Sequence, residues 1–241
     1  MTVGTSRVGT AGWAIASVHA ARFPGEGTHL ERYGRHFNAV EINSSFYRPH
    51  RRSTYERWAA SVPTDFRFSV KAPKAITHEH RLVDCDDLMS RFVDELRGLG
   101  DKLGVVLVQL PPSLAFAEEL LPMLKRLCNQ LGKSIQCEPR HASWFVPHVD
   151  AALAEMGIGR VAADPPPVSG ADRLGGGGNL AYFRLHGAPR IYWSRYEHAA
   201  LEAWSATALK EISKGRETWA ILDNTAAGFA LENAFELQVL L

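Results

Sequence analysis

Eight short apolar runs recur along this chain, and each ends at a polar, charged or aromatic residue, usually with Pro or Gly soon after. The runs lie at residues 8–13, 39–43, 66–71, 105–110, 134–138, 159–164, 180–186 and 219–223. Segments with helical spacing of apolar side chains separate most of them. Strands that alternate with helices indicate an α/β fold with a parallel sheet, and eight such units favour a closed (β/α)8 TIM barrel over an open sheet.

The helical segments carry recognisable start and stop signals. Ser53 followed by Glu56 matches a capping box that would open a helix before Pro63. Residues 165–179 break the pattern, because they contain three consecutive prolines and then four consecutive glycines. We expect a long loop there in place of the sixth helix. It follows a strand's carboxyl end, so it would either cover the site as a lid or have no role.

Length and composition fit one such barrel. The chain has 241 residues, and a single (β/α)8 barrel typically has about 250. No linker interrupts residues 1–241, so we expect a single domain. The 27 Lys and Arg nearly cancel the 26 Asp and Glu. The resulting net charge of +1 gives the whole molecule no attraction to nucleic acid or anionic lipid.

Three sparse cysteines, Cys85, Cys128 and Cys137, lack a CxxC or Cys/His ligand spacing and are typical of reduced thiols. The first residues lack the basic and apolar regions of a signal peptide. No apolar run approaches the length of a membrane span. We therefore expect a soluble, cytoplasmic protein without a membrane partner.

The polar residues at the run ends are the candidate site, because the functional face of such a barrel lies at the carboxyl ends of its strands. Side chains two apart on a strand share a face, so Glu41 points with Asn43, and Arg184 with His186. Asp223 and Asn224 are adjacent and point oppositely, and the sequence allows either to face inward. The candidate catalytic residues are Glu138, His186 and Glu41. The candidate substrate-binding residues are Trp13, Asn43, Tyr47, Lys71, Gln109, Arg140, His141, Asp164, Arg184 and Asn224.

The mixture of charges favours an anionic ligand over a metal ion. Carboxylates and a histidine could hold a divalent metal. However, no HxxE or HxH pair lies at the run ends, the His78 and His80 pair is too weak a signal for a metal site, and three interleaved cations, Lys71, Arg140 and Arg184, would repel a metal. Lys and Arg bind phosphate or carboxylate more naturally. We therefore expect no cofactor and no metal ligand. Glu138 and His186 are the best candidates for proton transfer, and Lys71 could instead form a Schiff base.

A second constellation mixes aromatic and basic side chains between Tyr47 and Trp58. This composition is typical of contacts with a single strand or a phosphate backbone, and a solvated loop has it too. It keeps open an alternative in which the chain binds nucleic acid or resembles an endonuclease.

Several of these motifs resemble those of the YecE-like proteins of domain of unknown function 72. The matching stretches follow in order along nearly the whole chain: GTAGW at 9–13, VEINSSFY at 40–47, FRFSVKAP at 66–73, QLPPS at 109–113, EPRH with Ser143-Trp144 from 138, YFRLHG at 182–187 and DNT at 223–225. The resemblance implies a single TIM barrel and a shared ligand site, and it brings no established activity. Residues 172–178 carry no family motif.

These observations predict a TIM-barrel enzyme, a hydrolase, lyase or isomerase, acting on a small anionic, phosphorylated or sugar-like substrate by general acid/base chemistry. Lys71, Arg140 and Arg184 would hold the anion, and Glu138 or His186 would move protons. Two alternatives remain: the nucleic-acid-binding protein above, and a non-catalytic ligand-binding protein. The sequence leaves the substrate, the reaction and the oligomeric state open.

Overall fold

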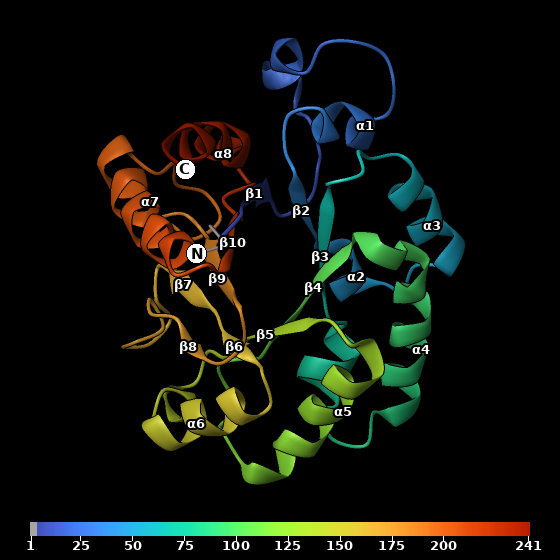
Figure 1. Cartoon of the computed structure of the whole chain (residues 1–241), viewed down its shortest axis with the longest axis vertical. Helices are drawn as coiled ribbons and strands as arrows, with labels where there is room; N and C mark the ends of the chain where they lie inside the picture. The colour runs from blue at the N-terminus through green and yellow to red at the C-terminus, as the bar shows by residue number, and fades with distance from the viewer. Residues whose placement is uncertain (1–3) are drawn as a thin grey trace.

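The computed structural model describes residues 4–241 as strands surrounded by helices (Figure 1). The strands are β1 (Ser6–Thr10), β2 (Ala39–Ile42), β3 (Arg67–Lys71), β4 (Leu103–Gln109), β5 (Ser134–Glu138), β6 (Gly159–Arg160), β7 (Ala162–Asp164), β8 (Gly175–Gly176), β9 (Leu180–Leu185) and β10 (Glu217–Leu222). The α-helices are α1 (His29–Gly34), α2 (Ser44–Tyr47), α3 (Arg52–Ala60), α4 (Asp86–Leu96), α5 (Leu121–Leu131), α6 (Pro147–Glu155), α7 (His198–Ser213) and α8 (Phe229–Leu240). Shorter turns are η1 (Ser17–Arg22), the π-helical η2 (Ala75–Glu79), η3 (Arg97–Lys102), η4 (Glu118–Leu120) and η5 (Ala142–Trp144).

The strands form two sheets in which every pairing but one is parallel. One sheet has the order β1-β10-β9-β7, and the other has the order β2-β3-β4-β5-β6-β8. The expected α/β class is therefore confirmed, but the strand ladders do not close into one continuous sheet. The predicted sixth strand is split at Val161 into β6 and β7, which belong to different sheets. A single bridge between Ala11 and Glu41 links β1 to β2.

Buried apolar side chains form two separate clusters. The larger one packs strands against helices and includes Phe23, Phe92 and Leu185. The smaller one lies on the opposite faces of the strands and consists of Ala39, Val105, Leu107, Val161, Leu180, Tyr182, Trp219 and Ile221. Alternation along each strand separates the two. Trp219 fills this inner cluster so closely that a Cβ on Gly104 would lie 2.6 Å from its ring.

Residues 165–179 contain no helix, as the sequence predicts, and residues 170–176 of this loop are held by β6 and by Arg160. β8, within this loop, pairs antiparallel with β6. Arg160 donates to the carbonyls of Gly170 and Arg173, and its guanidinium pairs with Asp150 of α6. This part of the loop therefore packs beside α6, and these contacts give no support to a lid over the strand ends.

One predicted helix cap is wrong. Helix α3 begins at Arg52 behind Arg51, and Ser53 lies inside its first turn. The capping box forms instead at α1, where the Thr28 hydroxyl accepts from the amide of Glu31 and Glu31 accepts from the amide of Thr28.

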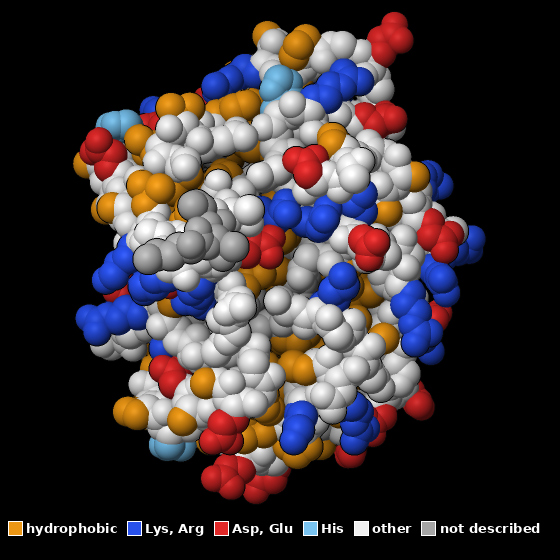
Figure 2. Space-filling view, viewed as in Figure 1, with side chains coloured by type: hydrophobic (Ala, Val, Ile, Leu, Met, Phe, Trp, Pro, Cys, Tyr) orange, Lys and Arg blue, Asp and Glu red, His pale blue; other side chains and the backbone are white. Residues whose placement is uncertain are grey.

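The surface agrees with the small net charge. Figure 2 shows acidic and basic side chains interspersed over one face of the molecule. Within residues 4–241, no helix is long and apolar enough to cross a bilayer.

Candidate functional site

A single buried arginine joins three carboxylates at the carboxyl ends of the strands. Arg184 of β9 is fully buried. It donates to both oxygens of Glu41, at 3.1 Å from Nε and 2.7 Å from Nη2. Its Nη1 donates to Glu138 Oε2 at 2.7 Å, and its Nη2 donates to Asp223 Oδ2 at 3.0 Å. Residues from β2, β5, β9 and the end of β10 therefore meet at one point.

Below this cluster, a phenol completes the contacts of Glu41. The Tyr182 hydroxyl donates to Glu41 Oε2 at 3.0 Å and lies 2.7 Å from the Ser69 hydroxyl. Burial, followed by the charge of Glu41, raises the pKa of Tyr182 well above its ordinary value. The phenol therefore remains neutral, and its hydroxyl keeps donating a hydrogen bond to Glu41.

Glu138 is the most heavily bonded carboxylate. Its Oε1 accepts from Gln109 Nε2 at 2.9 Å and from Arg140 Nε and Nη2 at 3.2 and 3.1 Å. Burial alone would raise the pKa of Glu138, but Arg184, His186 and Arg140 hold it well below its ordinary value. Glu138 is thus a stable anion and a weak base.

His186 lies between two of these carboxylates. Its Nδ1 is 3.0 Å from Asp223 Oδ2. Its Nε2 is 3.3 Å from Glu138 Oε1, but this contact lacks hydrogen-bond geometry, and Nε2 has no partner within the described residues. Burial and Arg184 lower the pKa of His186, and the hydrogen bond to Asp223 and the nearby carboxylate of Glu138 outweigh them, so the net shift is upward. When His186 is protonated, Nε2 has one N–H that a ligand could accept from.

Lys71 is the one cation of the site without a carboxylate partner in residues 4–241. It is 6% exposed, and its Nζ lies 4.2 Å from the centre of the Phe46 ring. Burial, followed by the charge of Arg184, lowers the pKa of Lys71 to about 8. Nearby His78 shows the same positive surroundings, since burial, Lys71 and Arg140 lower its pKa to about 4.

Arg140 and Tyr192 cover this group on the solvent side. The side chain of Arg140 is 22% exposed, and its Nη2 lies 3.5 Å from the Tyr192 hydroxyl. The Tyr192 ring meets the His186 ring edge to face, with 5.6 Å between centres. Tyr192 adopts a φ of 69°, which is uncommon for a residue with a side chain and is typical of strained functional loops.

The remaining candidates near the strand ends surround a neighbouring hollow. Trp13 and Asn43 line a space of about 400 Å³ together with His29 and Ser44. Trp13 packs edge to face on Trp58 at 5.0 Å. The amide oxygen of Asn43 is buried and has no partner among residues 4–241. These two residues are therefore available to a ligand that extends from the central cluster.

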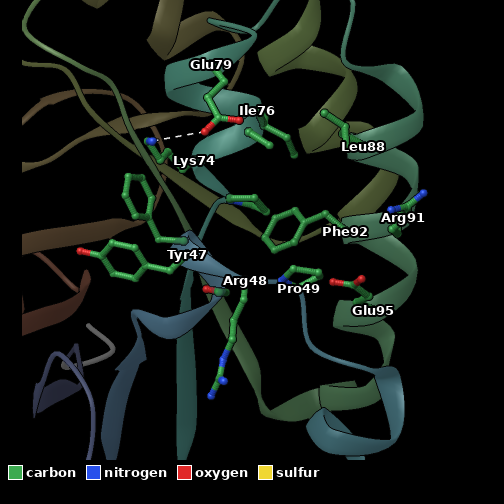
Figure 3. A pocket seen from close by; sticks show the side chains of 14 residues that line it. Tyr47, Arg48, Pro49, Lys74, Ile76, Glu79, Leu88, Arg91, Phe92 and Glu95 are labelled. Atoms are coloured by element: carbon green, nitrogen blue, oxygen red, sulfur yellow. Dashed lines mark ion pairs between the residues drawn. The ribbon is translucent and has the colours of Figure 1, made fainter.

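Tyr47 lies farther out and is 75% exposed. It borders a second hollow of about 340 Å³ between α2, η2 and α4, which Figure 3 shows with Pro49, Ile76 and Phe92 around it. The other aromatic residues of the basic stretch point inward: Tyr55 is fully buried and Trp58 packs on His50. This leaves Tyr47 as the exposed aromatic side chain of that stretch.

Four candidates have contacts that differ from the expected ones. Arg184 is placed in the site, but its donors are engaged by carboxylates, so it does not present a free cation. Asn224 turns the other way from Asp223, and its Nδ2 bonds to the Ser194 carbonyl and Asn233 Oδ1.

The other two candidates have local backbone roles. Asp164 pairs in register with the outward-facing Leu185, and its carbonyl accepts from the Tyr196 hydroxyl. His141 caps η5 by accepting from the Ser143 amide. The alternation within β7 and β10 explains why Asp164 and Asn224 lie outside the charged group.

The structure also adds residues that the sequence interpretation did not select. These are Ser69, Tyr182, His78, Phe46, Tyr192 and Asp223, the last having been left open against Asn224. Tyr182 and Ser69 precede Arg184 and Lys71 by two residues, so strand periodicity alone could have placed them on the same face. No comparable signal marks Tyr192, which reaches the site from a loop.

The arrangement fits an anion better than a cation. Within residues 4–241, no three His, Cys, Asp or Glu side chains are arranged to hold a metal ion. The space among Glu41, Glu138 and Asp223 is filled by the Arg184 guanidinium. Three basic side chains, Lys71, Arg140 and His186, lie around these carboxylates, and within the described residues Lys71 alone has no carboxylate contact.

Comparisons with known proteins agree on one family. A family model described as protein of unknown function DUF72 matches residues 7–241. The protein YecE of Escherichia coli K12 is 33% identical over 151 residues, which cover 60% of this chain and 55% of that protein. The protein YunF of Bacillus subtilis is 26% identical over 250 residues, which cover 88% of this chain and 86% of that protein.

Solved structures agree with the fold. A DUF72 family protein from Thermotoga maritima superposes with a TM-score of 0.81 at 24% identity, covering 98% of each chain. A D-psicose 3-epimerase superposes with a TM-score of 0.51 at 9% identity, covering 87% of this chain and 83% of that chain. These likenesses concern the fold alone.

Proposed function

Because this chain belongs to the DUF72 family of proteins of unknown function, we propose a function from its own site: a barrel enzyme that binds a small anionic substrate and transfers protons through His186. The chain spans about half the length of the E. coli relative that it matches, so nothing is carried over from that protein.

We infer that the two sheets belong to one (β/α)8 barrel domain. The bridge from Ala11 to Glu41 joins them on one side, and Val161 alone separates β6 from β7 on the other. The inner apolar cluster is what a barrel interior requires. A Cβ on Gly9 would lie 2.1 Å from the Ala39 carbonyl oxygen, so a glycine permits β1 to approach β2 this closely. The helices lie outside the strands in Figure 1.

One observation carries the functional proposal: Arg184 binds all three carboxylates of the site, and three further basic side chains, Lys71, Arg140 and His186, lie beside them. Lys71 has no carboxylate partner within residues 4–241, and Arg140 shares a single oxygen of Glu138 with Gln109. His186 offers an unpartnered Nε2. Such converging N–H groups in a partly buried site recognise phosphate or carboxylate oxygens.

The same geometry supports His186 as the group that donates the proton. Its raised pKa makes it an acid whose Nδ1 proton is fixed by Asp223, so the Nε2 proton is the one that a substrate oxygen can receive. The pKa of Glu138 is too low for its carboxyl group to carry the proton that an acid donates. Glu138 positions His186 and Arg140 instead. Glu41 orients Arg184. Asn43 and Trp13 extend the site toward the neutral part of a sugar-like ligand.

Binding of anions is tested by isothermal titration calorimetry with inorganic phosphate, ribose 5-phosphate and uncharged ribose at pH 7. We expect the two phosphates to bind and ribose to bind at least tenfold more weakly. Lys71→Met and Arg140→Gln should each weaken phosphate binding about tenfold or more, since a charge-assisted hydrogen bond contributes about 1.5–3 kcal/mol. Arg97→Gln, which replaces an exposed arginine, is the control. Equal binding of ribose and ribose 5-phosphate would contradict the proposal.

Proton transfer is tested separately, by proton NMR of sugar phosphates incubated with the protein in deuterated water. Loss of a carbon-bound proton signal, or appearance of a product, is expected with the intact chain. His186→Gln should abolish it while leaving phosphate binding measurable. Binding without exchange or product for any phosphate that binds would favour the non-catalytic alternative.

A further inference from the structure

Lys71 is placed differently from an ordinary anion-binding lysine. It comes from the carboxyl end of β3 and is almost completely buried, yet no ion pair within residues 4–241 neutralises it. Its amine lies against the face of Phe46, whose ring also meets His78 edge to face at 4.9 Å. The charges that act on it come from four other elements: Arg184 of β9, Glu41 of β2, Glu138 of β5 and Asp223 after β10.

Two physical conditions turn a lysine into a nucleophile at neutral pH, and both are present. One is removal from water, and the other is a neighbouring cation that disfavours the protonated amine. Burial lowers the pKa of Lys71 and Arg184 lowers it further, while the three carboxylates oppose the shift, and the result is about 8. At pH 7.5 roughly a quarter of such amines are neutral, against roughly one in a thousand for a surface lysine with a pKa near 10.4.

The other lysines near the site lack these conditions. Lys74, only three residues farther along the chain, is half exposed and pairs with Glu79 at 3.2 Å (Figure 3). It therefore serves as a matched control from the same segment.

We propose that Lys71 forms an imine with the aldehyde or ketone group of an anionic substrate, held by Arg140 beside His186. This inference rests on the proposed function and narrows its substrate class to carbonyl compounds that carry a phosphate or carboxylate.

The step balances without any further reactant. The neutral Nζ attacks the carbonyl carbon, and the carbonyl oxygen takes a proton, which the His186 imidazolium supplies. The carbinolamine nitrogen returns one proton to His186, the hydroxyl takes this proton and leaves as water, and a protonated carbon–nitrogen double bond forms. Loss of the remaining N–H proton to His186 gives the neutral imine and restores the imidazolium, so both amine protons leave in the water. One amine and one carbonyl give one imine and one water. The Asp223–His186 pair is suited to return the proton, because Asp223 holds the ring through Nδ1 and leaves Nε2 free.

The test uses the full chain with glyoxylate, a small aldehyde that carries a carboxylate, and cyanoborohydride, which reduces an imine to a stable secondary amine. Peptide mass mapping then locates the label. At pH 7.5 we expect Lys71 to carry at least tenfold more label than Lys74, and the labelling rate of Lys71 to rise with a midpoint near pH 8. Inorganic phosphate should protect Lys71 by competing for Arg140.

Two variants separate nucleophilicity from charge. Lys71→Arg keeps the cation and should lose the label while retaining phosphate binding by calorimetry. Lys74→Arg should leave the Lys71 label unchanged.

Phosphate binding with equal labelling of Lys71 and Lys74 in the unaltered chain would overturn this inference and leave the proposed function standing. Absence of both phosphate binding and labelling would overturn the two together. Because the labelling ratio and its pH midpoint come from the unaltered chain, poor folding of Lys71→Arg would not prevent either outcome.

Discussion

Replacing Arg184 with methionine removes the guanidinium from among three buried carboxylates. Glu138 would keep Gln109 and Arg140, and Asp223 would keep His186, but Glu41 would keep Tyr182 as its remaining side-chain donor. Removing one partner of a buried ion pair costs about 3–5 kcal/mol. Since two of the three carboxylates retain donors, we expect a loss near 3 kcal/mol at pH 7. In a chain of this size that lowers the melting temperature by about 6–12 °C.

The pH dependence of this loss identifies its cause. In the native protein the pKa values of Glu138 and Asp223 are lowered, so their contribution to stability is complete above their unfolded values near pH 4 and is lost only as the pH falls below them. Without Arg184, burial raises the carboxylate pKa values, so the folded variant takes up protons as the pH falls from 7 to 5. The variant therefore gains stability relative to the native protein on acidification.

The assay is urea denaturation of both proteins at pH 7 and pH 5. We expect the difference in unfolding free energy to narrow by about 1 kcal/mol or more at pH 5. Arg52→Met provides the control, because Arg52 is half exposed in its pairs with Glu56 and Asp94 and should cost less than about 1 kcal/mol at either pH. A loss below 1 kcal/mol for Arg184→Met, or an equal loss at both pH values, would refute the assignment of Arg184 as the neutralising centre.

Three further predictions concern individual side chains. Tyr182→Phe leaves Glu41 Oε2 without its hydroxyl donor and should cost about 1–3 kcal/mol in urea denaturation, while exposed Tyr47→Phe should change stability by less than about 0.5 kcal/mol; equal effects would contradict the buried contact. Asn224→Ala should lower the free energy of unfolding by about 1–2 kcal/mol and leave phosphate affinity unchanged. A loss of phosphate affinity without a loss of stability would show that Asn224 contacts the ligand. In Lys71→Met, phosphate binding should still weaken as the pH rises through the raised pKa of His186, and adding His186→Gln should remove this dependence; a pH profile that keeps its shape would show that His186 does not face the ligand.

The strand ends were predictable from sequence because period-two alternation and the parallel arrangement both follow from local patterns. Glu41, Lys71, Gln109, Glu138 and His186 meet as that reasoning requires. The pairing among them was not predictable, because a guanidinium and a carboxylate at neighbouring strand ends can each face either a ligand or one another. Only the three-dimensional register shows that Arg184 is surrounded by carboxylates.

The remaining differences concern which residues of a strand face inward and which residues reach the site from loops. Asp164 and Asn224 were assigned to the site because they end apolar runs, but each lies one residue out of phase with the inward-facing positions. Arg184 pairs in register with Ala163 and Ile221, and these positions set the phase for both strands. Tyr192 reaches His186 from the loop after β9, where strand periodicity gives no information, so only its aromatic ring and its place on a loop of the site face could mark it.

The buried ionic network needs an explanation beyond stability, because well-packed apolar side chains of similar volume would stabilise a barrel interior at least as well. Arg184 binds Glu41, Glu138 and Asp223, and two of these carboxylates in turn hold Arg140 and the Nδ1 of His186. The side chains that these carboxylates hold are basic. Lys71 is the exception, since no carboxylate holds its amine. This network holds the neighbouring basic side chains in place and leaves one buried amine unpaired. Such an arrangement is better suited to a reaction at that amine than to binding an ion. Labelling of Lys71 distinguishes these two roles.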